Sequence, residues 1–215
     1  MAERPSLRIF LARHGQTDWN LVRRMQGWTD IPLNDTGRVQ AKELAAKVQG
    51  LVFDSVYCSE LSRSRETATI VADGRPVVPL RQLNERCFGV FEGERLDFAD
   101  ELFLAEFRRR CTDPDDCLDS GESYRQHRAR VEEAMSIIRE RHPSGQVLII
   151  GHGGTNQVIL HVLLNLSKAE LATRHQENSD VFVVELSEKP HLWLSLEEFD
   201  EPRSHEGTKI HEQGR

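Results

Sequence analysis

Two short apolar runs in this chain each end abruptly in a histidine followed by a glycine. The junctions read Arg13-His14-Gly15 after residues 7–11, and Gly151-His152-Gly153-Gly154 after residues 147–150. Apolar runs of this length are typical of buried strands, and open α/β sheets bind ligands beyond the carboxyl ends of their strands. Glycine lets the backbone turn sharply and approach a ligand closely. A chain with two such junctions is therefore expected to fold around a sheet edge that holds an anion.

Helix-like and strand-like segments alternate through the rest of the chain. Apolar residues recur at helical spacing over 36–50, 59–74, 124–141 and 155–166, and strand-like runs occupy 53–58, 77–80, 181–186 and 192–196. Pro79 makes the run 77–80 an edge strand, because proline cannot donate to a central ladder. With 215 residues, the alternation predicts one α/β domain with a substantial core.

The segment from about residue 89 to 122 departs from this alternation. It is charged, and its pattern predicts a short helix over 98–110 followed by an acidic loop containing Asp113, Asp115, Asp116 and Asp119. We interpret it as a small cap inserted into the α/β domain, which spans residues 1–199. The hydrophilic stretch 200–215 predicts a disordered C-terminal tail.

Charge and cysteine content narrow the partners and the compartment. The net charge of −7, without a long basic block, argues against nucleic acid and anionic membrane as partners. No apolar stretch approaches the roughly 20 residues that span a bilayer, and the N-terminus lacks a signal-peptide core, so we expect a cytoplasmic protein. The four cysteines have neither the spacing of a zinc site nor that of a disulfide framework, which predicts reduced thiols.

The residues at the two junctions are suited to phosphoryl transfer if they face one another. A phosphate monoester needs fixed donors around its oxygens, a nucleophile in line with the leaving oxygen, and an acid. A neutral His14, oriented by a backbone carbonyl, can attack phosphorus through a ring nitrogen. Positive charge would come from His152, Arg13 and Arg63, since the planar fork of arginine grips two phosphate oxygens. Arg65 lies roughly 200 degrees around the helix from Arg63, so only one of them points at the pocket.

Four ordered elements carry a family resemblance: Arg13-His14-Gly15-x-Thr17-x-x-Asn20, Ser59-x-Leu61-x-Arg63-x-x-x-Thr67, Leu83-Asn84-Glu85-Arg86-x-Phe88-Gly89 with Glu92-Gly93, and Gly151-His152-Gly153. Together they resemble the histidine phosphatase superfamily, also called the phosphoglycerate mutase-like family, over residues 7–187. The resemblance implies a parallel-sheet α/β fold and a phosphohistidine mechanism with no metal and no cofactor. We therefore expect a single-domain, three-layer α/β/α sandwich with a mostly parallel central sheet and a small cap insertion.

The resemblance also assigns roles to individual residues. It makes His14 the nucleophile and Glu85 the proton donor, which must hold its proton until the leaving group departs. It places Arg13, Arg63 and His152 in the phosphate pocket. Further substrate contacts are implied for Asn20, Gln26, Gly27, Arg86 and the backbone amide of Gly153. In the family a Gly-Glu-Ser segment borders the active site, so Glu122 and Ser123 either reach substrate or serve the adjoining helix, Ser123 as its cap.

Two branches of the family remain open. Mutases resemble this chain at Gly27-Trp28-x-Asp30 and at Glu85-Arg86-x-Phe88-Gly89. A mutase must retain a doubly phosphorylated intermediate and exclude water, which calls for more basic residues over the pocket and a longer cap. This cap is short and acidic. After the second histidine, the sequence is Gly153-Gly154-Thr155-Asn156-Gln157, whereas mutases have a sequence similar to Gly-Asn-Ser-Leu-Arg at this place. Both departures favour a phosphatase, with mutase-type phosphoryl transfer as the alternative.

The expected partner is a small phosphorylated metabolite. Candidates are sugar phosphates, phosphoglycerate derivatives, nucleotide-loop precursors of cobalamin and phosphoserine, hydrolysed by a monomer or homodimer. A catalytically silent phosphate-binding regulatory module on the same fold is a less favoured hypothesis. Loss of the nucleophile or the acid would mark such a module, and both His14 and Glu85 are present.

Overall fold

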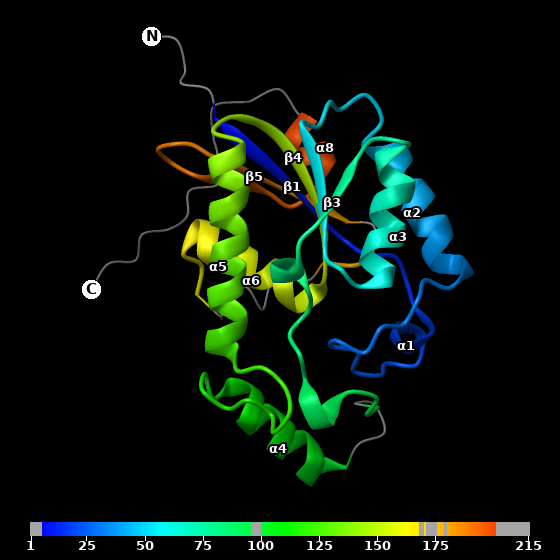
Figure 1. Cartoon of the computed structure of the whole chain (residues 1–215), viewed down its shortest axis with the longest axis vertical. Helices are drawn as coiled ribbons and strands as arrows, with labels where there is room; N and C mark the ends of the chain where they lie inside the picture. Colours follow the sequence, from blue (N-terminus) through cyan, green and yellow to red (C-terminus); the bar gives the residue numbers. More distant parts are fainter. Residues whose placement is uncertain (1–5, 96–99, 168–169, 171–175, 179, 201–215) are drawn as a thin grey trace.

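A central sheet organises the protein (Figure 1). The computed structural model describes residues 6–95, 100–167, 170, 176–178 and 180–200. Within them, six strands pair in the order β3-β2-β4-β1-β5-β6. Their bounds are β1 Leu7–Arg13, β2 Ser55–Cys58, β3 Val77–Pro79, β4 Gly145–Gly151, β5 Val181–Leu186 and β6 His191–Trp193. Strands β1 to β4 run parallel, while β5 pairs antiparallel with β1 and with β6. The expected mostly parallel sheet is confirmed, with β3 at one edge.

Helices cover both faces of the sheet, which gives the three expected layers (Figure 1). On one face lie α2 (Asp35–Lys47), α3 (Ser62–Ala72) and α8 (Leu196–Asp200); on the other lie α5 (Tyr124–Arg141) and α6 (Gly153–Leu164). Alternating residues of β4 serve the two faces, because successive strand side chains point to opposite sides. Val147 and Ile149 join the core beneath α5 and α6, whereas Leu148 and Ile150 join the core beneath α2 and α3.

Local hydrogen bonds explain where several helices begin. The Ser123 side chain accepts the amide of Gln126, whose own side chain returns to the Ser123 backbone, so a capping box starts α5. This confirms the cap interpretation of Ser123. The helix predicted from residue 59 instead begins at Ser62, because the Ser59 hydroxyl accepts the Leu61 amide and is held outside the helix.

The C-terminal prediction needs correction. The strand expected over 192–196 ends at Trp193, and Leu196 begins α8. The Ser195 hydroxyl accepts the Glu198 amide, which starts a helix where the alternating leucines predict more strand. Asp200 is therefore the last residue of a helix, not the first of a tail, and residues 201–215 lie outside the described residues.

The predicted cap lies beyond the carboxyl edge of the sheet (Figure 1). It contains the short helices η2 (Gly89–Phe91) and α4 (Glu101–Thr112), and residues 96–99, which include the expected start of α4, are not described. Phe91 packs edge-on against Phe103 and Phe107, with ring centroids 5.6 and 5.1 Å away. Two shorter helices, α1 (Asp18–Leu21) and η1 (Arg81–Leu83), lie in the loops between the cap and the sheet.

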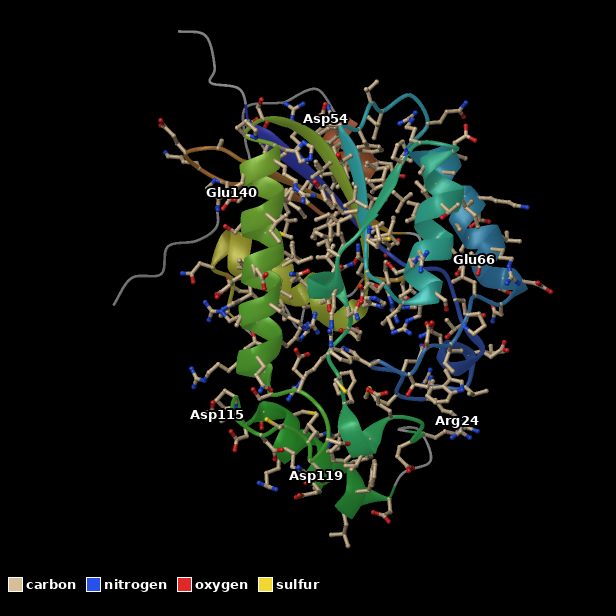
Figure 2. The ribbon with its side chains drawn as sticks, in the orientation of Figure 1. Arg24, Asp54, Glu66, Asp115, Asp119 and Glu140 are labelled. Carbon is tan, nitrogen blue, oxygen red and sulfur yellow. The ribbon has the colours of Figure 1, made fainter. Side chains whose placement is uncertain are left out.

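Arginines neutralise most of the acidic loop in the cap. Arg110 pairs with Asp116 and Asp119 at 2.8 and 3.0 Å, and Arg125 pairs with Asp115 at 2.7 Å. Figure 2 shows Asp115 and Asp119 at the end of the molecule opposite Asp54. Arginines of α4 and α5 therefore balance three of the four acidic side chains, which weakens the acidity of the cap as evidence against a mutase.

The two ends of the cap meet at close quarters. The Glu122 amide donates to the Cys87 carbonyl at 2.9 Å, and a side chain at Gly89 would place a Cβ 2.6 Å from the backbone nitrogen of Gly121. Glycine at position 89, where φ is +54°, is thus required twice, for conformation and for space. Among the described helices, none is both long and apolar enough to cross a membrane.

Candidate active site

The two histidine–glycine junctions lie side by side because β1 and β4 are neighbours in the sheet. Arg13 is paired with Gly151 at the end of the ladder, and the His14 amide continues it by donating to the Gly151 carbonyl at 3.1 Å. The rings of His14 and His152 have centroids 5.0 Å apart. A cavity of about 710 Å³ opens here, and its lining includes Arg13, His14, Asn20, Gln26, Gly27, Arg63, Glu85 and Gly153.

His14 is held as a neutral base with one nitrogen committed. Its Nδ1 lies 2.7 Å from the Gly15 carbonyl oxygen, and a carbonyl can only accept, so Nδ1 carries the proton. The lone pair is then on Nε2. The side chain is nearly inaccessible, and burial, followed by the charges of Arg63 and Arg13, holds the pKa of His14 well below its ordinary value. A buried, neutral imidazole with a fixed tautomer is suited to attack an electrophile through Nε2.

His152 is tied through its other nitrogen. Its Nε2 lies 2.8 Å from the Ser59 hydroxyl, while its buried Nδ1 has no hydrogen-bond partner among the described residues. The Ser59 oxygen already accepts the Leu61 amide, so its proton is free to go to Nε2, and His152 can keep its own proton on Nδ1. Burial and nearby Arg63 hold the pKa of His152 well below its ordinary value. His152 is thus a neutral ring suited to donate a hydrogen bond from Nδ1, and the expectation that it supplies positive charge is wrong, because its burial disfavours the charged form.

Two buried arginines supply the positive charge. Arg63 is 1% exposed, and its guanidinium donates to the carbonyls of Gly27 at 2.8 Å and Thr29 at 3.1 Å. Burial lowers the pKa of Arg63 to about 10, so it remains charged at neutral pH. Arg13 donates to the Gln176 carbonyl at 3.2 Å, and burial lowers its pKa as well. In the part of the chain that the structure describes, Nε of each arginine has no hydrogen-bond partner. Arg65 is exposed.

Glu85 lies across the cavity at the N-terminus of α6. Its carboxylate accepts the amides of Gly154 and Thr155, both at 3.0 Å, and lies 3.1 Å from the Thr155 hydroxyl. A Cβ at position 154 would approach Glu85 Oε1 to 2.7 Å, so this contact depends on glycine. The charge of Glu85 also favours the charged forms of Arg13 and Arg63. A carboxyl group and two cations therefore share one pocket with His14.

The residues of the loop after β1 that are expected to contact substrate line the cavity: Asn20, Gln26 and Gly27. Thr17 orders the first two of them. Thr17 caps α1, and its hydroxyl donates to Gln26 Oε1 at 3.0 Å. Its amide donates to Asn20 Oδ1 at 3.1 Å. Gly27 has a φ of +55°, and a Cβ there would lie 2.0 Å from Glu92 Oε1. The loop is therefore pinned against the start of the cap.

Arg86, expected to contact substrate, points elsewhere. Its guanidinium donates to the carbonyls of Glu122 at 2.9 Å, Cys111 at 3.3 Å and Asp116 at 3.4 Å. It is not among the described residues that line the cavity. The guanidinium thus ties the cap to the domain, because three carbonyls converge where its fork reaches.

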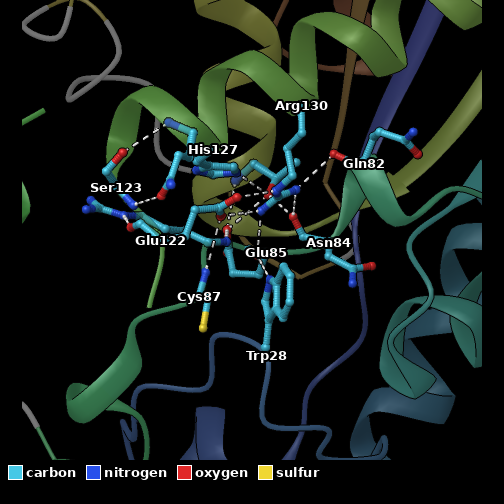
Figure 3. A network of polar contacts seen from close by, with 12 residues as sticks. Trp28, Gln82, Asn84, Glu85, Cys87, Glu122, Ser123, His127 and Arg130 are labelled. Carbon is cyan, nitrogen blue, oxygen red and sulfur yellow. Dashed lines mark hydrogen bonds and ion pairs between the residues drawn. The ribbon is translucent and has the colours of Figure 1, made fainter. Parts of the chain in front are cut away.

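A network behind Glu85 has no counterpart in the sequence prediction (Figure 3). Its centre is Arg130 on α5, which donates to the Glu85 carbonyl at 2.7 Å and pairs with both oxygens of Glu122 at 2.7 and 2.8 Å. Trp28 donates from Nε1 to the same Glu85 carbonyl at 2.6 Å. The segment bordering the active site thus contributes Glu122 as the partner of an arginine. Within the described residues, no three His, Cys, Asp or Glu side chains are grouped to hold a metal ion.

Comparisons with known proteins show the family to which the chain is similar. The family model described as histidine phosphatase superfamily (branch 1) matches residues 9–197. The uncharacterized phosphatase PhoE of Bacillus subtilis is 32% identical over 158 residues, which are 73% of this chain and 75% of that protein. A probable phosphoglycerate mutase GpmB of Cronobacter sakazakii is 29% identical over 193 residues, 88% of each chain. The solved structure of YhfR from Bacillus stearothermophilus is similar with a TM-score of 0.77 and 29% identity, over 87% of this chain and 96% of that one.

Proposed function

Because this chain belongs to the histidine phosphatase superfamily, branch 1, we propose that it hydrolyses a small-molecule phosphate monoester through a phosphohistidine on His14. The observation that carries the proposal is the pairing of a neutral His14, anchored through Nδ1 to Gly15, with a carboxyl group on Glu85 in the same cavity. A nucleophile and an acid are the two groups that a phosphatase without a metal needs.

In the first step, His14 Nε2 attacks phosphorus and the bond from phosphorus to the leaving oxygen breaks. Glu85 gives its proton to that oxygen, so an alcohol departs and Glu85 becomes a carboxylate. Arg13 and Arg63 surround the phosphoryl oxygens, whose negative charge they balance throughout. A phosphoryl oxygen would also give the Nδ1 proton of His152 the acceptor that it lacks among the described residues.

In the second step, water attacks the phosphorus of the phosphohistidine. Glu85 takes a proton from that water, the bond from phosphorus to His14 Nε2 breaks, and inorganic phosphate leaves. The enzyme returns to a neutral His14, and the proton that Glu85 takes from water replaces the one that it gave to the leaving group. Dividing hydrolysis into two displacements lets one carboxyl group serve first as acid and then as base.

The test is turnover of p-nitrophenyl phosphate, and of a broad panel of phosphate esters, by the purified protein in EDTA. We expect hydrolysis, together with acid-labile phosphate on His14 that is absent from His14→Ala. No turnover of any ester would contradict the phosphatase proposal and favour a silent phosphate-binding module. Full activity in His14→Ala would contradict the phosphohistidine mechanism even if hydrolysis occurs.

Mutase activity is the second candidate, favoured by the similarity to the probable phosphoglycerate mutase GpmB. Incubation with 3-phosphoglycerate separates the two. We expect release of free phosphate to exceed formation of 2-phosphoglycerate, because the cap is short. Isomerisation that outpaces phosphate release would instead assign this chain to the mutases.

A further inference from the structure

The guanidinium of Arg130 donates hydrogen bonds to one short stretch of backbone. Nη1 donates to the carbonyls of Gln82 at 2.9 Å and Asn84 at 2.6 Å, and Nη2 donates to that of Glu85 at 2.7 Å. Three carbonyls within four residues are thereby bound to one rigid, planar group on α5. The backbone that carries the proposed proton donor is consequently held against α5 (Figure 3).

Glu122 fixes Arg130 in turn. Its two oxygens accept from Nε and Nη2 at 2.7 and 2.8 Å, a fork-to-fork pairing between side chains that are only 12% and 14% exposed. Lysine has the same charge but cannot reproduce this planar set of five contacts. The pairing therefore sets the plane of the guanidinium as well as its charge.

The same network reaches the phosphate-binding side of the cavity. Trp28 donates to the Glu85 carbonyl at 2.6 Å, and its ring lies 5.9 Å from the Arg130 guanidinium. The preceding residue, Gly27, accepts from Arg63 at 2.8 Å. One continuous chain of contacts thus joins the arginine that would grip phosphate to the backbone of the residue that would donate the proton.

We propose that Arg130 is a positioning residue that keeps the Glu85 carboxyl in register with the phosphate-binding arginines, and that Glu122 orients Arg130 for this task. The inference rests on the proposed function, since it concerns proton donation to a departing oxygen. Arg130 is not among the described residues that line the cavity. It acts through the backbone of residues 82–85.

A displaced general acid has a kinetic signature that a general loss of structure lacks. Misplacement of a reacting group by about 1 Å can cost about 100-fold in rate. That cost falls on esters whose leaving group needs a proton as the bond breaks, such as phenyl phosphate. The dinitrophenolate ion leaves without a proton, so 2,4-dinitrophenyl phosphate reports on His14 and the arginines but hardly on Glu85.

The experiment compares kcat/KM for these two esters in the full chain. For Arg130→Lys we expect a loss of about 100-fold on phenyl phosphate and of no more than about threefold on 2,4-dinitrophenyl phosphate. Activity on the activated ester shows that the variant is folded. Equal losses on both esters, or no loss on either, would overturn the proposal.

Glu122→Gln tests the same idea while leaving the guanidinium in place. It weakens the paired hydrogen bonds between residue 122 and Arg130 without removing the three contacts from Arg130 to backbone carbonyls. We therefore expect a loss of about tenfold in kcat/KM on phenyl phosphate and little loss on 2,4-dinitrophenyl phosphate. The matched control is Arg128→Ala, two residues away on α5, where the arginine forms an exposed pair with Glu132. That variant should keep the wild-type ratio between the two esters.

The two proposals fail in different ways. If the wild-type protein hydrolyses neither ester, the proposed function falls and this inference falls with it. If the wild-type protein hydrolyses both, His14→Ala hydrolyses neither, and the ratio is unchanged in Arg130→Lys and Glu122→Gln, the phosphatase proposal stands and only the role of Arg130 is wrong.

Discussion

The two junctions share a histidine followed by a glycine, yet each histidine ring is held through a different nitrogen. His14 donates a hydrogen bond from Nδ1 to the Gly15 carbonyl, which leaves Nε2 as the basic atom. His152 has Nε2 against the Ser59 hydroxyl, which leaves Nδ1 facing no described partner. Both rings are buried and have a lowered pKa. The difference teaches that the partner of the second nitrogen, and not the motif, suits one histidine to the proposed role of nucleophile and the other to that of hydrogen-bond donor.

The backbone after each histidine differs as well. After His14 the chain enters a loop, and a Cβ at Gly15 would lie 2.3 Å from the Gly37 carbonyl oxygen. After His152 the helix α6 begins at once, and its first amides are available to Glu85. The nearest atom to a Cβ at Gly153 is 3.7 Å away, in the Arg13 guanidinium. Gly15 allows close packing against Gly37, whereas Gly153 is the first residue of α6.

Replacing each histidine by alanine should give the largest difference in kcat/KM between the two junctions. His14→Ala should lower kcat/KM by about 10⁴-fold or more and abolish acid-labile phosphate on the protein, since the nucleophile is gone. His152→Ala should cost about 100-fold, typical of a lost donor to the transition state, while His14 is still phosphorylated. The measurement is steady-state kinetics with radiolabelled substrate. Labelling that vanishes in both variants would break the distinction.

Stability against pH should show that both rings are neutral in the folded protein. His14, His127 and His152 all have folded pKa values well below the ordinary 6.5. Below pH 6.5 the unfolded chain binds protons that the folded one does not, so the free energy of unfolding falls as pH falls. Each histidine contributes about 1.4 kcal/mol per pH unit, or about 4 for the three.

Urea unfolding between about pH 7.5 and pH 5 measures this slope. His14→Gln and His152→Gln should each reduce it by about a third, and His127→Gln, outside both junctions, should do the same. If only one junction variant changes the slope, the two rings differ in charge as well as in their partners.

Substitution of the two glycines by alanine should change the free energy of unfolding by very different amounts. Gly15→Ala should lower the free energy of unfolding by about 3 kcal/mol or more, because backbone rather than a flexible side chain blocks the new methyl group. Gly153→Ala should change it by less than about 1 kcal/mol, or stabilise the protein, since alanine suits the start of a helix. Denaturant titration of the pair decides this. Similar losses would show that both glycines are needed for space.

The smallest expected effect concerns the partner of His152. Ser59→Ala removes the hydroxyl beside Nε2, and we expect a loss of about tenfold in kcat/KM from a buried nitrogen left unpaired. Phosphorylation of His14 should persist. Ser62→Ala, at the start of the neighbouring helix α3, is the control, because its hydroxyl donates to Asp30 and not to His152. Wild-type kinetics in Ser59→Ala would show that the hydroxyl does not set the orientation of His152.

Local signals account for what the sequence predicts well. An apolar run followed by glycine marks a strand end directly, which is why the sequence alone suffices to predict His14 and His152 at one edge of the sheet. The bounds of α5 are predicted residue for residue, because the Ser123 cap and the apolar spacing are both local. The run 192–196 misleads because Ser195 starts a helix inside an alternating pattern.

Arg130 and Arg86 have no such signal. The acceptors of Arg130 are mostly main-chain carbonyls more than forty residues earlier, and those of Arg86 are carbonyls in and beside the cap. Every residue has a carbonyl, so no side-chain pattern indicates which ones will converge. Arg86 therefore resembles a substrate ligand in the sequence, and Arg130 resembles a surface residue of a helix.

The strand order has a consequence for how the protein is made. β1 and β2 are consecutive in the chain but do not pair, because β4, which begins at Gly145, lies between them. A growing polypeptide that stops before that residue contains β1 and β2 without the strand that pairs with both of them. It also contains His14 without His152. The cavity that we propose as the phosphate site is complete only when β4 lies between β1 and β2. A ligand that binds the finished pocket alone adds its binding free energy to that late step of folding.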